Sequence, residues 1–206
     1  MARGRLITIE GIDGAGKTTL AASLHRALRE RGVDIELLRE PGGVALAEQI
    51  RALVKDPALE ISDRAETLLY AASRAQLLAE LVEPALSGGH WILLDRYVDS
   101  SLAYQGAGRG LGIAAVAAIN AFATAGLAAD RTLLLALDPA AGRARRGGRD
   151  DYPDRLEREA DPFFAAIAAA YAELAAADPA RIRTLDATLA PEAVLDAALA
   201  ALADLL

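Results

Sequence analysis

The chain has 206 residues, a net charge of −7 and no cysteine. This length suits one domain with a sizeable core, and the lack of cysteine excludes disulfides and thiolate metal sites. The acidic balance argues against broad nucleic-acid binding, and a chain that is about a quarter alanine favours packed helices over a membrane span. Residues 1–5 do not resemble a secretory signal, so we expect a single soluble domain over residues 1–206, in the cytoplasm.

The first predicted strand, residues 6–9, leads into a glycine-rich segment that is followed by an apolar-periodic helix. This order is typical of a P-loop. Its glycines let backbone N–H groups approach a polyphosphate, whose charge the start of the helix also favours. Lys17 is placed to reach the outer phosphates, and the Thr18 hydroxyl to bind Mg²⁺. The predicted nucleotide-binding residues are Gly11, Ile12, Asp13, Gly14, Ala15, Gly16, Lys17, Thr18 and Thr19.

A second strand, residues 33–38, ends in Arg39-Glu40-Pro41-Gly42-Gly43. A Pro-Gly-Gly sequence punctuates loops of every kind. Opposite charges at the end of a strand also suit the edge where parallel sheets bind ligands. The residues alone leave both interpretations open. A helix with Arg51 away from its apolar face follows.

A longer helix is predicted from Ser62 or Asp63 to about Leu86. Tyr70 and Arg74 are four residues apart and so share one face. Such a pair can stack on a nucleobase and bind its edge, although an ordinary amphipathic helix also explains it. The residues expected to turn toward the core are Ala65, Leu68, Leu69, Ala72 and Leu78.

The third predicted strand, from Trp91, ends at Asp95 and Arg96. A short apolar run that ends in aspartate indicates a buried parallel strand with a Walker-B-like carboxylate. It would bring Asp95 near Thr18 and Arg96 near the phosphates. The polar residues expected to form a small pocket beyond it are Ser100, Ser101, Tyr104 and Gln105.

Residues 111–129 carry no charge over about the length that spans a bilayer. They are mostly alanine, so we expect a buried or interface helix and no membrane partner. A fourth strand, residues 132–137, precedes the segment 143–156, in which arginines alternate with glycine and aspartate. We expect this segment to be a short lid whose arginines neutralise a transferring phosphoryl group, although a solvated loop also explains it.

A helix at 162–177, a strand at 181–186 and a helix at 191–206 complete the chain. The alternation of strands and helices predicts an α/β fold, a five-stranded parallel sheet with helices on both faces.

Four segments together make the chain resemble the bacterial thymidylate kinases along almost its whole length. They are Gly-Ile-Asp-Gly-Ala-Gly-Lys-Thr-Thr, Arg-Glu-Pro-Gly-Gly, Leu-Leu-Tyr-Ala-Ala-Ser-Arg and Asp-Arg-Tyr-Val-Asp-Ser-Ser-Leu-Ala-Tyr-Gln-Gly. The resemblance implies a P-loop NTPase-like fold and transfer of the γ-phosphoryl group of ATP to dTMP, with Mg²⁺. It also implies a homodimer and, together with the tight Pro-Gly-Gly turn, a cis Glu40–Pro41 bond.

The resemblance further implies roles for individual residues. Tyr70 would stack on thymine, Arg74 with Ser101 or Gln105 would meet the base edge, and Tyr104 would crowd out a 2′-hydroxyl. Catalytic roles fall on Lys17, Arg96, Asp95, Asp13 and Arg149, metal binding on Thr18, Glu40 and Asp95, and further ATP contacts on Arg143 and Arg145. The predicted acceptor-binding residues are Asp13, Glu40, Arg51, Tyr70, Arg74, Arg96, Ser100, Ser101, Tyr104 and Gln105.

Two other functions are compatible with the P-loop. One is a nucleoside or nucleotide kinase with a different acceptor, and the other is a nucleotide-dependent binding module without transferase activity. A guanine-nucleotide switch is disfavoured because it needs an Asn-Lys-x-Asp element, and the single asparagine, Asn120, is followed by alanine.

Overall fold

The computed structural model describes residues 3–146, 155–156 and 158–206. Its centre is a five-stranded, all-parallel sheet with the order β2-β3-β1-β4-β5. This confirms the predicted α/β fold and all five strands, with ends shifted by one or two residues. The strands are β1 (Leu6–Gly11), β2 (Ile35–Arg39), β3 (Trp91–Asp95), β4 (Arg131–Ala136) and β5 (Ile182–Asp186).

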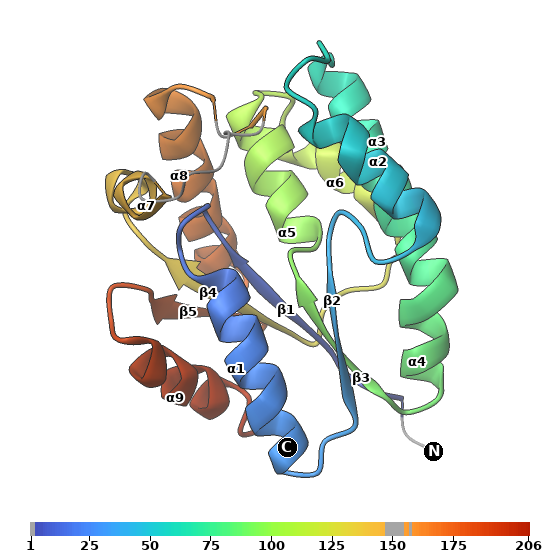
Figure 1. Cartoon of the computed structure of the whole chain (residues 1–206), viewed down its shortest axis with the longest axis vertical. Coiled ribbons are helices and arrows are strands. Elements are labelled where there is room, and N and C mark those ends of the chain that lie inside the picture. The colour runs from blue at the N-terminus through green and yellow to red at the C-terminus, as the bar shows by residue number, and fades with distance from the viewer. Residues whose placement is uncertain (1–2, 147–154, 157) are drawn as a thin grey trace.

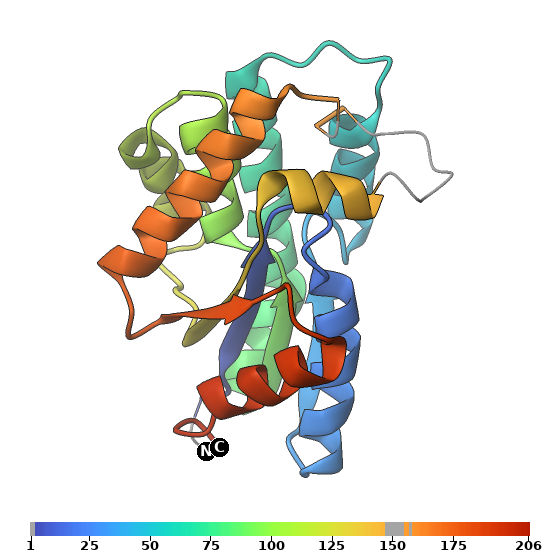
Figure 2. The same ribbon diagram turned by 90° about the vertical axis from the view of Figure 1, so that its left-hand side faces the viewer.

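The central strand β1 is buried along its whole length, between β3 and β4. Helices α1 (Lys17–Glu30) and α9 (Pro191–Ala201) cover one face of the sheet. The other face is covered by α4 (Glu83–Ser87), α5 (Val98–Ser101) and α8 (Asp161–Ala177) (Figures 1 and 2). After β1 the chain forms β2 and β3 on one side of this strand and then crosses to β4 on its other side. Parallel sheets bind ligands beyond the carboxyl ends of the strands where the winding direction changes in this way, and the loop after β1 lies there.

The remaining elements lie around this layered core. Helix α2 (Ala45–Lys55) packs on α3 (Asp63–Leu77), which packs on α6 (Ile113–Ala123). A π-helical turn, η1 (Leu78–Val82), joins α3 to α4, so the helix predicted to reach Leu86 is continuous in that range. The others are the π-helical η2 (Leu102–Gly108) and helix α7 (Pro139–Arg146).

The predicted inward face of the helix that begins with α3 is confirmed at Leu78, which is 1% exposed, but is wrong at three of the other four positions. Leu68 is 57% exposed, and Ala65 and Ala72 also face outward. The buried face carries Glu66 and Arg74 instead, because each makes ion pairs inside the molecule. Apolar periodicity locates a core face only where that face meets other apolar groups, and this one lines a polar site.

Helix α6 is shorter than the uncharged run that contains it. Ala125 and Gly126 have positive φ, so the chain turns away after Ala123. Val116 and Asn120 are buried, whereas Phe122 is 91% exposed. Within the described residues, no helix is long and apolar enough to cross a membrane.

Candidate active site

The loop between β1 and α1 has the conformation that its glycines permit. Gly14 and Gly16 have φ of +84° and +96°, values that L side chains rarely adopt. A Cβ on Gly14 would lie 2.2 Å from the carbonyl oxygen of Gly142, so α7 can pack against the loop only because this position is glycine. Gly16 ends the loop directly before α1, whose N-terminus therefore opens onto it.

Lys17 is held over this loop. Its Nζ donates to the carbonyl oxygen of Ile12 at 2.8 Å and lies 3.7 Å from Asp13 Oδ1. Burial, helped by the nearby charge of Arg96, lowers the pKa of Lys17 to about 8. Beside it, Thr18 Oγ1 donates to Asp95 Oδ2 at 3.2 Å, which joins the P-loop to the end of β3 as predicted.

Arg96 connects the P-loop to the segment after β3. It has φ of +72°, and its Nη1 donates to the carbonyl oxygen of Gly11 at 3.1 Å and to Ser100 Oγ at 3.0 Å. Its Nη2 bonds Asp13 and donates to Tyr104 Oη at 3.2 Å. Tyr104 in turn donates to Asp13 Oδ2 at 3.0 Å. Arg96, Asp13 and Tyr104, all of them predicted site residues, therefore form a closed network of hydrogen bonds.

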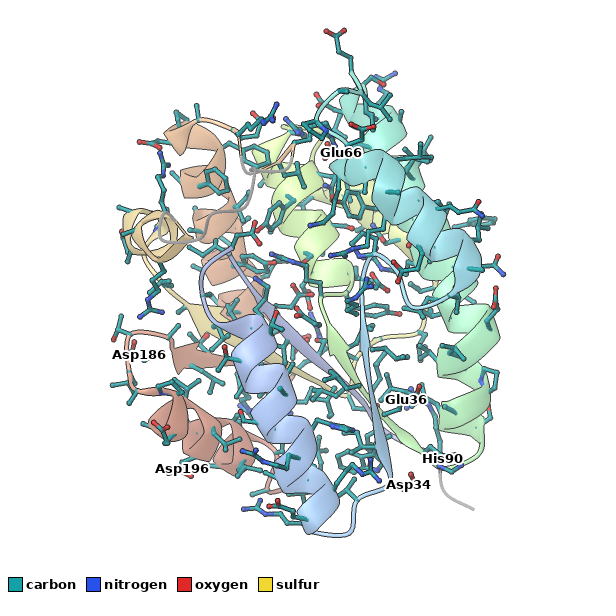
Figure 3. All side chains as sticks on the ribbon, viewed as in Figure 1. Asp34, Glu36, Glu66, His90, Asp186 and Asp196 are labelled. Atoms are coloured by element: carbon teal, nitrogen blue, oxygen red, sulfur yellow. The ribbon has the colours of Figure 1, made fainter. Side chains whose placement is uncertain are left out.

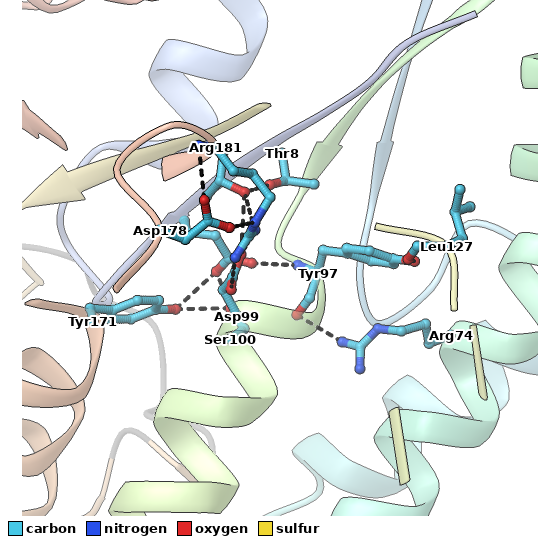
Figure 4. Close-up of polar contacts among 11 residues, drawn as sticks. Thr8, Arg74, Tyr97, Asp99, Ser100, Leu127, Tyr171, Asp178 and Arg181 are labelled. Atoms are coloured by element: carbon cyan, nitrogen blue, oxygen red, sulfur yellow. Dashed lines mark hydrogen bonds and ion pairs between the residues drawn. The ribbon is translucent and has the colours of Figure 1, made fainter. Parts of the chain in front are cut away.

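Glu10, near the end of β1, accepts hydrogen bonds from residues that adjoin this network. Its carboxylate accepts from Tyr97 N at 2.7 Å, Ser100 Oγ at 2.5 Å and Tyr171 Oη at 2.9 Å. Burial, together with the charge of Asp99, raises the pKa of Glu10 to about 7. In Figure 4, Tyr97 just before α5, Ser100 of α5 and Tyr171 of α8 belong to one hydrogen-bonded group. Sequence analysis missed Glu10, although a carboxylate inside an apolar strand was a visible signal.

Arg74 lies fully inside the molecule at the end of the site nearest α6. It donates to Glu40 Oε2 at 2.8 Å, Ser101 Oγ at 3.0 Å and the Tyr97 carbonyl at 2.9 Å, and also to Asn120. Glu40 precedes a cis peptide bond to Pro41, as predicted, and its Oε1 is buried with no hydrogen-bond partner among the described residues. Burial raises the pKa of Glu40, against the opposing charge of Arg74.

A cavity of about 630 Å³ brings most of the predicted residues together. Lys17 and Thr18 of the P-loop line it together with Tyr70 and Gln105. Arg39, one of the two opposite charges expected at the end of the second strand, also lines it, as do Lys55 and Leu156, which sequence analysis did not assign to the site. The predicted residues in its lining are Asp13, Gly14, Gly16, Lys17, Thr18, Thr19, Glu40, Arg51, Tyr70, Arg74, Asp95, Arg96, Ser100, Ser101, Tyr104 and Gln105.

Among the lid arginines whose side chains the structure describes, Arg143, Arg145 and Arg155 are not in the lining. Arg143 pairs with Asp161, and Arg145 Nη1 donates to the carbonyl oxygen of Ala187 at 2.9 Å. Both belong to α7, so residues 143–146 continue a helix that begins at Pro139. Arg149 lies outside the described residues.

A parallel sheet with a Lys-Thr glycine loop after its central strand, and a carboxylate at the end of the next strand, defines a P-loop nucleotide-binding protein. The sequence profile of the family described as "Thymidylate kinase" matches residues 9–198. The chain belongs to this family.

Named thymidylate kinases align with this chain along nearly its full length. The chain is 45% identical to the thymidylate kinase of Halorhodospira halophila over 206 residues, which cover 99% of this chain and 96% of the relative. It is 49% identical to that of Deinococcus radiodurans, over 96% of this chain and 95% of the relative. It is 46% identical to that of Enterococcus faecalis, over 95% of this chain and 93% of the relative.

Proposed function

We propose that the chain transfers the γ-phosphoryl group of ATP to dTMP, which gives dTDP and ADP. Family membership supports the reaction. The observation that carries it to this chain is that Lys17, Arg96 and Tyr70 line one cavity. A phosphate-binding loop and an aromatic ring that line the same cavity allow two nucleotides to bind with their phosphates facing each other.

On the donor side, backbone N–H groups of the P-loop and Lys17 hold the ATP phosphates. Thr18 and Asp95 are adjacent oxygen donors that line the cavity, and so does Glu40, whose buried Oε1 has no hydrogen-bond partner among the described residues. Such a hydroxyl-and-carboxylate set fits Mg²⁺, which takes few protein ligands and completes its shell with water and phosphate. No cluster of three or more His, Cys, Asp or Glu is found among the described residues, so this site would depend on the nucleotide. Held by these residues, Mg²⁺ would neutralise charge on the phosphates.

In the transfer step itself, the protein has to align the two phosphates and neutralise charge on the transferring group. Arg96 is oriented by four acceptors on the chain, which take up both N–H groups of each Nη, so a hydrogen bond to an incoming phosphate would come from Nε or would replace one of these partners. A catalytic base is unnecessary because the attacking group is already an ionised phosphate. Asp13, hydrogen-bonded to Arg96 and Tyr104, would lie near the acceptor sugar.

On the acceptor side, Tyr70 provides a ring for stacking, and Arg51 is held by a 2.8 Å bond from its Nη1 to the carbonyl oxygen of Pro41. The five N–H groups of Arg74 all meet acceptors on the chain, so contact with the base edge would require it to exchange a partner. The lid at about 143–156 within one domain, and the roles of Arg143, Arg145 and Arg149, stay predictions.

We also propose a homodimer. Helices α2, α3 and α6 lie side by side (Figure 1) and carry Leu46, Leu53, Leu68 and Phe122, which are 46%, 47%, 57% and 91% exposed. Large apolar groups on adjacent helices favour burial against a partner. Because the proposed substrates are ATP and dTMP, we place the protein in the cytoplasm, where nucleotides are made and used.

An ADP-release assay tests the proposal, with dTMP, dUMP, TMP and dGMP as acceptors. We expect a strong preference for dTMP. A preference for another monophosphate would favour a different nucleotide kinase. ATP turnover that dTMP does not change would favour a nucleotide-dependent binding module.

A further inference from the structure

Glu66 is a buried carboxylate that the proposed mechanism does not use. It lies in the first turn of α3, near the upper end of the molecule in Figure 3, and its exposure is 0%. A charge removed from water in this way needs partners that replace its hydration. Those partners connect Glu66 to the acceptor end of the site.

Four N–H groups converge on this carboxylate. Gln105 Nε2 donates to Oε1 at 2.9 Å, and Arg109 donates from Nη2 to Oε2 at 3.1 Å and more weakly from Nε to Oε1 at 3.4 Å. Arg155 donates to Oε2 as well. Arg109 is itself fixed by Glu159 and by the Phe163 ring, 4.9 Å from its guanidinium carbon. The orientation of Glu66 is therefore determined by several contacts at once.

This carboxylate decides which way the Gln105 amide points. An ionised carboxylate only accepts hydrogen bonds, so Gln105 must turn its NH₂ group toward Glu66. The amide oxygen then points away from Glu66. Gln105 is 2% exposed and lines the cavity beside Tyr70 and Arg74. The cavity thus receives a fixed carbonyl acceptor.

A fixed acceptor distinguishes pyrimidines by the state of N3. Thymine and uracil carry hydrogen on N3 and can donate to it, whereas cytosine presents a bare N3 that accepts. To serve cytosine, the Gln105 amide would have to flip and place its oxygen against the Glu66 carboxylate, where two acceptors repel. Discrimination built on such an unpaired polar group is stronger than discrimination by shape.

We propose that Glu66 is a positioning residue that sets acceptor specificity: by locking the Gln105 amide, it selects pyrimidine monophosphates with hydrogen on N3 and rejects cytosine. This inference rests on the proposed function. In this proposal, Glu66 does not contact the substrate itself.

The test is Glu66→Gln, assayed with dTMP and dCMP. A carboxamide at 66 can donate or accept, so the Gln105 amide is free to flip. We expect kcat/KM for dTMP to fall about tenfold, mostly through KM, and the dTMP-to-dCMP ratio of kcat/KM to fall about 10-fold to 100-fold. Equal losses on both substrates, with the ratio unchanged, would mean that Glu66 only maintains structure and would overturn the inference.

Two further variants separate positioning from folding. Gln105→Leu removes the amide, so it should lower the dTMP-to-dCMP ratio of kcat/KM, and this test does not require Glu66→Gln to fold. In the double variant, Glu66→Gln should cause no further change in this ratio. A normal ratio in Gln105→Leu, or an additive effect in the double variant, would overturn the inference. Arg109→Gln is the matched control, because it removes the two N–H groups that Arg109 directs at Glu66 but keeps the bond between Glu66 and Gln105, and it should leave the ratio unchanged.

The wild-type assay separates the two proposals. A wild-type protein that does not phosphorylate dTMP would overturn the proposed function and this inference together. A wild type that prefers dTMP, with a Glu66→Gln ratio equal to its own, would overturn only the inference.

Discussion

Arg96 donates from Nη1 to Ser100 Oγ at 3.0 Å, and Ser100 in turn donates to the buried Glu10 at 2.5 Å. The guanidinium that faces the cavity is therefore held by a chain of hydrogen bonds that ends on a carboxylate in the central strand. Further in, Asp99 ties the same region to β5, because Arg181 donates to it at 2.7 and 3.0 Å (Figure 4). A site built this way is arranged before substrate arrives.

Replacing Arg96 by alanine should mainly lower turnover. In the proposed mechanism this charge neutralises the transferring phosphoryl group, and removal of one preorganised donor typically costs about 10²-fold to 10³-fold in kcat. Steady-state kinetics measure it, with Arg64→Ala on the exposed side of α3 as the control. Normal turnover in the Arg96 variant would contradict its role.

Tyr70→Ala should mainly weaken dTMP binding. Stacking of a base on an aromatic ring is worth about 1–3 kcal/mol, so we expect KM for dTMP to rise roughly 5-fold to 100-fold. Tyr70→Phe keeps the ring and serves as the control, with a KM close to that of the wild type. If both variants lose binding equally, the hydroxyl and not the ring is what matters.

The P-loop and the strand ends were predictable because local rules determine them. Lys17, Thr18 and Asp95 meet because parallel strands bring their carboxyl ends to one edge. The inward face of α3 was not predictable, because Glu66 and Arg74 are buried through partners more than 25 residues away in the chain. Glu10 was missed for the same reason, since its donors come from Tyr97, Ser100 and Tyr171.

Binding of ATP should be accompanied by proton uptake near pH 8. The pKa of Lys17 is lowered to about 8, so part of the population is neutral there, and phosphate charge favours the ammonium form. Affinity should therefore fall as the pH rises above 8. Calorimetric titrations in two buffers of different ionisation enthalpy measure the uptake, and Lys17→Met should abolish it. An observed enthalpy that does not depend on the buffer would argue against a lowered pKa.

Glu10→Gln should change how stability depends on pH. The pKa of Glu10 is raised from 4.5 to about 7, so the folded state binds more protons than the unfolded state between these values. This group's contribution to the free energy of unfolding is therefore lost as the pH rises from about 4.5 to 7, by up to about 3 kcal/mol.

Urea unfolding at several pH values between 5 and 7.5, at one protein concentration, measures the difference. Relative to wild type, the Glu10→Gln protein should become progressively more favoured as the pH rises, whatever its constant offset. Glu192→Gln, on the exposed start of α9, should run parallel to wild type. A Glu10→Gln curve that also runs parallel would show that the carboxyl titrates normally.

Phe122→Glu should convert the proposed homodimer to monomer. The ring is 91% exposed on α6, and a charge placed there would be buried without a partner in an interface. Light scattering after size-exclusion chromatography gives the mass of each form. Leu189→Glu changes an apolar residue that is 49% exposed between β5 and α9, away from α2, α3 and α6, and should leave the mass unchanged. A wild-type chain that elutes at the monomer mass would remove the proposed dimer, and a Phe122→Glu variant that stays dimeric would place the interface elsewhere.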